Sequence, residues 1–323
     1  MARTDFGGQA LLEGVLMRGR NAVGVALRTP DGSIVAAAEP LNSILHRNRF
    51  ARAPFFRGLV LLYETLVIGT RWLMRSGSVQ AEGEGQELGK GTIALTLIVT
   101  LGMAVGLFVL LPLFLAGATT QAVLGPGQAL IAHLVEGVIR VVIFVGYLLV
   151  VSRFKDIQRT FEYHGAEHMT IHALEHEEPL TVANVRKYPT AHQRCGTEFL
   201  VIFIILSILM FSLLAGQNIW VSIIGRVLLV PVIASLAYEL LRFGARYRHH
   251  WWIRWLYLPG IWLQAITTKQ PDDAQIEVAI ASMQEALAAN GEAAPAGSLD
   301  PVRSPIPMAS AEKKAGSATD RAA

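Results

Sequence analysis

Four long apolar runs dominate this chain and limit the folds that it can adopt. Each is long enough to cross the apolar core of a bilayer as a helix, and they cover residues 92–116, 129–152, 199–216 and 219–241. In the whole chain, 52% of the residues are hydrophobic and only 16% are charged, which is more apolar than a typical soluble domain. We therefore predict a mainly α, polytopic membrane protein with transmembrane helices 1 and 2 in 92–152 and transmembrane helices 3 and 4 in 199–241.

The positive charges outside these runs predict how the helices are oriented. Residues 1–91 contain eleven lysines and arginines and residues 153–197 contain six, whereas residues 117–128 contain none. Cytoplasmic loops of membrane proteins carry an excess of Lys and Arg. We therefore expect a multi-pass protein of the plasma membrane, with the N-terminus, the loop at 153–198 and the C-terminus all in the cytoplasm.

The cytoplasmic N-terminal region, 1–91, shows its own structural signals. Apolar-rich runs at 22–27 and 33–39 flank a turn sequence, Thr-Pro-Asp-Gly, and predict a small β-hairpin. Charged residues interrupt the helical pattern at 55–75, which favours an interfacial or re-entrant helix over a span. The Gly- and Glu-rich stretch 77–91 is expected to be a linker.

Beyond the fourth run, residues 242–289 are predicted to form a cytoplasmic juxtamembrane segment followed by a helix. Residues 242–254 mix arginine, histidine and tryptophan, as is typical of the headgroup level of a membrane. Since they directly follow a span, we expect membrane lipid rather than nucleic acid as their partner. Acidic residues at an expected N-cap begin the helix at 272–289. The tail, 290–323, is rich in Ala, Pro, Gly and Ser, and we expect it to be disordered.

Two short clusters of potential metal ligands lie between the second and third apolar runs. His164 and His168 are one helical turn apart, with Glu167 beside them, and His192 and Cys195 follow in an H-x-x-C spacing. Residues at i and i+4 lie one above the other on a helix, and a thiolate with imidazoles suits zinc better than magnesium or calcium. We therefore predict one zinc site formed by His164, His168, His192 and Cys195.

Other residues near these clusters are assigned differently. His172 and His176 continue toward an acidic segment, and we expect them to be exposed to solvent rather than to bind the ion. Glu13, in a glycine-rich stretch near the N-terminus, is a remote candidate for a carboxylate of the site. The alternative to a metal site is a solvated, histidine-rich helix with an unrelated buried cysteine.

Several motifs together give the chain a family resemblance. In order, they occupy residues 7–19, 163–175, 180–185, 192–200 and 259–268. Over roughly residues 5–288 the chain resembles the YqhQ-like family of uncharacterised bacterial membrane proteins, which is commonly labelled as a family of metal-dependent enzymes. The usual family pattern has proline where this chain has Gln193, but His192 and Cys195 match it. The resemblance therefore implies a membrane protein with a metal-dependent activity.

Two functions from different classes fit these features. The first is a zinc-dependent membrane hydrolase, acting at the cytoplasmic face on a lipid-linked or membrane-protein substrate. Glu167 would be its general base, and the ion would need an open coordination position. The alternative is a non-catalytic membrane scaffold or adaptor, in which a closed Cys/His shell stabilises the cytoplasmic loop. If all four predicted ligands bind at once, the shell closes and the scaffold is favoured.

Ionisable residues inside the apolar runs allow two further interpretations. Glu136 and Arg140 are spaced i, i+4 in the second run, and Arg226 and Glu239 lie in or near the fourth. Such groups are costly in a membrane and tend to face the protein interior. They could form ionic contacts that fix the packing of the helices, or they could line a transport pathway.

Overall fold

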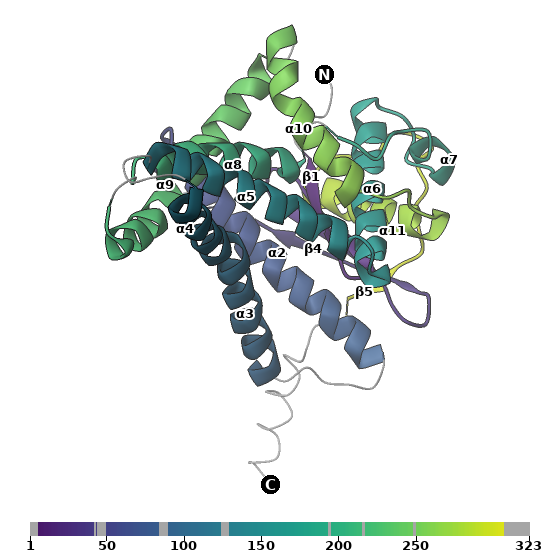
Figure 1. Ribbon diagram of the computed structural model, residues 1–323. Coiled ribbons are helices and arrows are strands. Elements are labelled where there is room, and N and C mark those ends of the chain that lie inside the picture. Colours follow the sequence, from purple (N-terminus) through teal and green to yellow (C-terminus); the bar gives the residue numbers. More distant parts are fainter. Residues whose placement is uncertain are drawn as a thin grey trace.

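The computed structural model describes residues 6–41, 43, 50–83, 90–123, 129–192, 195–214, 217–247 and 250–306. Its strands are β1 (Gly7–Leu11), β2 (Gly14–Arg18), β3 (Ala22–Arg28), β4 (Ile34–Pro40) and β5 (Ser304–Pro305). Its helices are η1 (Phe50–Arg52), α2 (Phe56–Gly83), α3 (Lys90–Val105), the π-helical η2 (Gly106–Leu110), α4 (Leu111–Val123), α5 (Ala129–Val151), α6 (Lys155–Glu175), α7 (Val182–Val185), α8 (Gly196–Ser212), α9 (Ile219–Arg246), α10 (Trp251–Thr267) and α11 (Asp273–Ala289). The fold is mainly helical, with one sheet beside a group of long helices (Figure 1).

The sheet is larger than the hairpin that the sequence predicts. Strands β3 and β4 pair from Ala22 opposite Pro40 to Arg28 opposite Ile34, which confirms the hairpin. Strands β1 and β2 add a second antiparallel pair, and β5 joins the edge of β4 in parallel. The glycines of β1 have a low strand propensity, so the sequence alone does not indicate this strand.

Both faces of the sheet are covered by helices. Side chains alternate between the faces of a strand, and Val15 and Met17 of β2 pack with buried residues of α6 and α11, whereas Leu16 packs on the opposite side with Trp72 of α2. Helix α11 begins where the sequence predicts, because Asp272 and Gln275 form a reciprocal capping box. The strands and these three helices therefore share two buried apolar layers.

Helix α2 connects the sheet to the long helices. Its first turns pack on α9, where Arg57 forms an ion pair with Glu239 and a side chain on Gly58 would collide with Tyr238. Its later turns cover the sheet. The helix runs past its predicted end at residue 75 to Gly83, so the first part of the expected linker is helical, and residues 84–89 lie outside the described residues.

Within the part of the chain that the structure describes, three helical stretches are long and apolar enough to cross a membrane: Ala94–Gly117, Leu134–Val151 and Trp220–Gly244. They correspond to the first, second and fourth predicted spans. The third, expected at 199–216, is the shorter apolar helix Gly196–Ser212, because Cys195 caps its beginning and a turn follows Ser212. The structure thus supports three candidate spans of full length rather than four.

The ionisable residues of the apolar helices pair with one another. The Glu136 carboxylate of α5 accepts from Arg140 at 2.6 Å and from Arg226 of α9 at 2.7 and 2.8 Å. All three side chains are buried. Glu239 is bound instead by Arg57 of α2. These charges therefore take part in contacts that join α5, α9 and α2.

The C-terminal part contains two departures from the sequence-based expectations. Residues 251–267 form helix α10 in spite of Pro259. Residues 290–306, expected to be disordered, pack on the fold: the Leu299 amide donates to the Leu180 carbonyl, and Ile306 is buried against the sheet. This burial and the pairing of β5 outweigh the polar composition. Residues 307–323 of the predicted tail, and 248–249 of the predicted headgroup-level segment, lie outside the described residues.

Candidate metal centre

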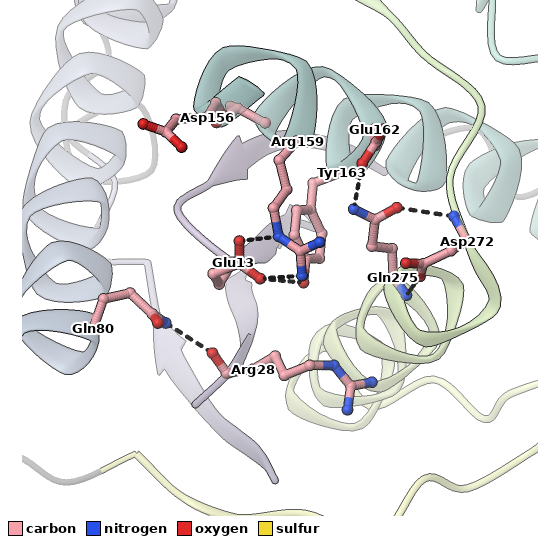
Figure 2. A network of polar contacts seen from close by, with 10 residues as sticks. Glu13, Arg28, Gln80, Asp156, Arg159, Glu162, Tyr163, Asp272 and Gln275 are labelled. Carbon is pink, nitrogen blue, oxygen red and sulfur yellow. Dashed lines mark hydrogen bonds and ion pairs between the residues drawn. The ribbon is translucent and has the colours of Figure 1, made fainter. Parts of the chain in front are cut away.

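Helix α6 carries most of the candidate ligands, and polar contacts fix it against its neighbours. The Tyr163 hydroxyl donates to the Glu13 carboxylate, which also forms an ion pair with Arg159 (Figure 2). From α11, Gln275 donates to Glu162 at 2.8 Å. These contacts, made before the first histidine, set the rotation of α6 about its axis. Glu13 serves this network and is not among the residues grouped around the candidate metal ligands.

Three of the four predicted ligands lie together. Nε2 of His164 is 3.3 Å from Sγ of Cys195, and the ring centroids of His164 and His168 are 4.4 Å apart. One donor atom of each residue lies within 4.8 Å of the others. We call His164, His168 and Cys195 the first donor group; their binding of an ion remains a prediction.

The two imidazoles of this group are oriented by backbone carbonyls. Nδ1 of His164 is 2.9 Å from the Thr267 carbonyl oxygen, and Nδ1 of His168 is 2.6 Å from that of Thr190. Because a carbonyl oxygen can only accept, each neutral ring carries its proton on Nδ1 and keeps the Nε2 lone pair for an ion. Burial lowers the pKa of His168 to about 2, with a further contribution from His164, so His168 stays neutral.

Cys195 reaches the group from the beginning of α8. It is the N-cap residue of that helix, and its Sγ accepts from the Thr197 amide at 3.5 Å. Burial raises the pKa of the thiol, which keeps it protonated when no cation is near. A metal ion favours the thiolate, so metal binding here would release a proton.

Glu167 is buried beside the first donor group. Burial raises its pKa to about 8, and the nearby His164 and the Gly8 amide act in the opposite direction. Its Oε2 has no hydrogen-bond partner among the described residues. A side-chain carbon on Gly8 would lie 2.8 Å from Cγ and Cδ of Glu167, so the glycine of β1 makes room for this carboxyl group. The arrangement provides a carboxyl group that can hold or release a proton near neutral pH.

The fourth predicted ligand, His192, belongs to a neighbouring group. Nε2 of His192 is 3.4 Å from Oε1 of Glu175, and donor atoms of His172, Glu175 and His192 all lie within 4.8 Å of one another. We call these three residues the second donor group. Sequence reasoning placed His172 in solvent, although its i+4 spacing from His168 was a signal that it shares the same face of α6. His176 is exposed, as predicted.

A cavity of about 540 Å³ lies next to the first donor group. Its lining is largely apolar and comes from β1, β2, α2, α8 and α9, including Leu61, Phe199 and Leu241. It borders Gly8, which contacts Glu167, and Gly196, which follows Cys195. Through these two glycines, the lining of the cavity adjoins the candidate metal site.

Comparisons with known proteins assign the chain to a family. Residues 53–289 match the family described as "Protein of unknown function (DUF1385)". The chain is also 35% identical to "Uncharacterized protein YqhQ" of Bacillus subtilis (strain 168) over 295 residues, which are 87% of this chain and 92% of that protein. No solved structure matches. The chain therefore belongs to the DUF1385 family, to which its resemblance to YqhQ-like proteins pointed.

Proposed function

We propose that the protein is a zinc-dependent hydrolase of the cell membrane, acting at the cytoplasmic face on a lipid-linked or membrane-protein substrate. The observation that carries this proposal is the division of the four predicted ligands. Three of them form the first donor group, while His192 lies with the second. Zinc sites with three protein ligands and an open position are typically catalytic, whereas closed four-ligand sites are structural.

The residues of the site suit this chemistry. Two neutral imidazoles and a thiolate are donors that zinc prefers, and carbonyl groups already orient both rings. Zinc bound there would lower the pKa of a water molecule and make it nucleophilic near neutral pH. Glu167 would accept the proton of that water and later pass it to the leaving group. Its burial in an apolar setting keeps bulk water from competing.

The cavity supports a membrane-derived substrate. Its apolar walls include α9, a candidate span, and the helices α2 and α8 that pack on it, and Arg18, which is ion-paired with Glu64 and bonded to Thr65, adds a polar group. An amphipathic molecule could place its apolar part among these helices and its polar part near β1. The three apolar stretches, with the shorter apolar helix α8 as a fourth crossing, would hold the protein in the membrane and leave the sheet and both termini in the cytoplasm.

The scaffold remains a second candidate because of where the ligands originate. His164 and His168 come from α6, which packs on the sheet, whereas Cys195 begins the apolar helix α8. An ion shared by these elements would tie the sheet to the apolar helices. In that case the ion would stabilise the fold without any chemistry at Glu167.

Substituting Glu167 separates the two candidates. Glu167→Gln keeps the shape of the side chain but cannot accept the proton. In the hydrolase, the variant should retain its metal and its membrane abundance and fail to complement a deletion strain. In the scaffold, it should complement fully.

A matched control comes from the same helix. Glu162→Gln makes the identical substitution one and a half turns away, and the new amide can still accept from Gln275. It should leave metal content and complementation at the wild-type level. Full complementation by Glu167→Gln would contradict the hydrolase.

A further inference from the structure

We propose that His172, Glu175 and His192 bind a second divalent transition-metal ion next to the first donor group, so that the protein holds two such ions along α6. The proposal goes beyond hydrolysis at the first group and does not require that group to be catalytic. It rests on the way in which two elements bring these three donors together.

The three side chains converge on one point. His172 and Glu175 are spaced i, i+3 on α6 and therefore lie on the same face. His192 approaches them from the segment before α8, with Nε2 3.4 Å from Oε1 of Glu175. The rings of His172 and His192 meet edge to face, with centroids 4.4 Å apart. Donor atoms from all three residues lie within 4.8 Å of one another, close enough for one ion to draw them together.

Backbone contacts hold this arrangement in place. The buried side chain of Gln264 accepts from the His192 amide at 2.8 Å and donates to the His192 carbonyl at 2.9 Å. Nε2 of His172 is 3.0 Å from the Ala191 carbonyl oxygen, so the neutral ring carries its proton there, and Nδ1 is the nitrogen proposed as the ligand. The same device, a carbonyl group bound to one ring nitrogen, orients both histidines of the first donor group.

The donor set defines the class of ion. Two imidazoles and one carboxylate are the protein ligands of many zinc sites, and they also suit other divalent first-row transition metals. Calcium and magnesium prefer oxygen ligands and do not fit. A simple contact between a carboxylate and one histidine would not account for the second imidazole, which an ion would.

The two groups are close enough to work on one substrate. His168 of the first group and His192 of the second have ring centroids 5.7 Å apart. Paired metal sites of enzymes hold the attacking and leaving oxygens of a displacement between two ions. The row of ligands at one-turn intervals on α6 would provide such a pair.

Cobalt(II) distinguishes the two sites, because only a site that contains Cys195 gives a thiolate-to-cobalt charge-transfer absorption. Metal-free, untagged full-length protein in detergent is titrated with cobalt(II), and the bound equivalents and the absorption are recorded together. We expect two equivalents per chain, of which one produces the absorption.

Variants assign each equivalent to a group. His172→Ala and the isosteric Glu175→Gln should each bind one equivalent and keep the full thiolate absorption. His164→Ala should lose the absorption while retaining the other equivalent. His176→Ala changes an exposed histidine at the C-cap of α6; it is the matched control and should bind two equivalents.

Three results would overturn the second site. These are a single equivalent that produces the thiolate absorption in the wild-type protein, two equivalents in both His172→Ala and Glu175→Gln, or loss of the thiolate absorption in His192→Ala with no change in His172→Ala. The last would make His192 a ligand of the first group. Failure of the first group alone looks different, because the wild-type protein would then bind cobalt without any thiolate absorption and His172→Ala would abolish that binding.

Discussion

The sheet with its covering helices and the group of apolar helices bury their side chains in opposite ways. We call β1–β5 with α2, α6 and α11 the sheet unit, and α3, α4, α5, α8 and α9 the apolar helices. In the sheet unit, both sheet faces are covered and large side chains such as Met283 are fully buried. In the stretch Ala94–Gly117 of the apolar helices, only 6% of the most apolar window is buried within the protein, so its apolar surface faces outward.

This difference is compatible with a membrane protein. The sheet unit buries its apolar surface within the protein, whereas the outward surface of the apolar helices suits an apolar surrounding such as lipid. The charged residues of the apolar helices avoid this outward surface, because Glu136, Arg140 and Arg226 form ion pairs in the interior. The first donor group lies where the two regions meet, with ligands on α6 and at the beginning of α8.

Breaking the buried ionic cluster should have the largest effect on stability. Glu136→Ala removes the carboxylate that both Arg140 and Arg226 contact, and leaves two buried guanidinium groups without it. Losing one partner of a buried ion pair costs about 3–5 kcal/mol. We expect a loss of that size in unfolding experiments in detergent, together with low membrane abundance. A free energy of unfolding within about 1 kcal/mol of wild type would show that the apolar helices tolerate Arg140 and Arg226 without the Glu136 carboxylate.

Truncating an apolar side chain should lower the free energy of unfolding much more in the sheet unit than on the outward surface of the apolar helices. Met283→Ala opens a cavity between α11 and the sheet and should cost about 2–5 kcal/mol. Ile98→Ala, on the outward surface of α3 where the side chain is 69% exposed, should change the free energy of unfolding in detergent by less than about 0.5 kcal/mol. Equal losses in the two variants would mean that α3 packs inside the protein.

A small effect is also expected for an exposed ion pair of the sheet unit. Arg71 of α2 contacts Glu39 of β4, and the Arg71 side chain is 53% exposed. Such pairs contribute about 0.2–1 kcal/mol and are screened by salt. Arg71→Ala should therefore lower the free energy of unfolding by less than about 1 kcal/mol, and less in high salt. A loss as large as that of Glu136→Ala would remove the contrast between exposed and buried pairs.

The sequence predicted the regular, periodic elements of this fold. The apolar runs, the face of α6 that carries His164 and His168, and the hairpin around Gly32 all follow from local patterns. Strands β1 and β5 do not, because β1 is rich in glycine and β5 is a two-residue strand held by long-range pairing. Helix α10 contains Pro259 and Gly260, which locally indicate a break; Gly260 instead lets Glu198 of α8 come close.

Part of the candidate site was likewise outside the reach of local patterns. Spacing along one helix correctly brought His164 and His168 together, and the H-x-x-C pattern drew attention to Cys195. The same pattern could not indicate that His192 turns toward His172 and Glu175, since Gln264 on a distant helix holds its backbone. Tertiary contacts, rather than spacing, decide how the ligands are divided.

The metal content of purified protein tests the central claim most directly, namely that the junction of α6 and α8 is a zinc site. Untagged wild-type protein, His164→Ala and Cys195→Ser are isolated from membranes, and zinc per chain is measured alongside a thermal unfolding curve. We predict zinc in the wild-type protein and the loss of one ion per chain in each folded variant. Wild-type protein without metal, or folded variants with unchanged zinc, would contradict a zinc site at this junction.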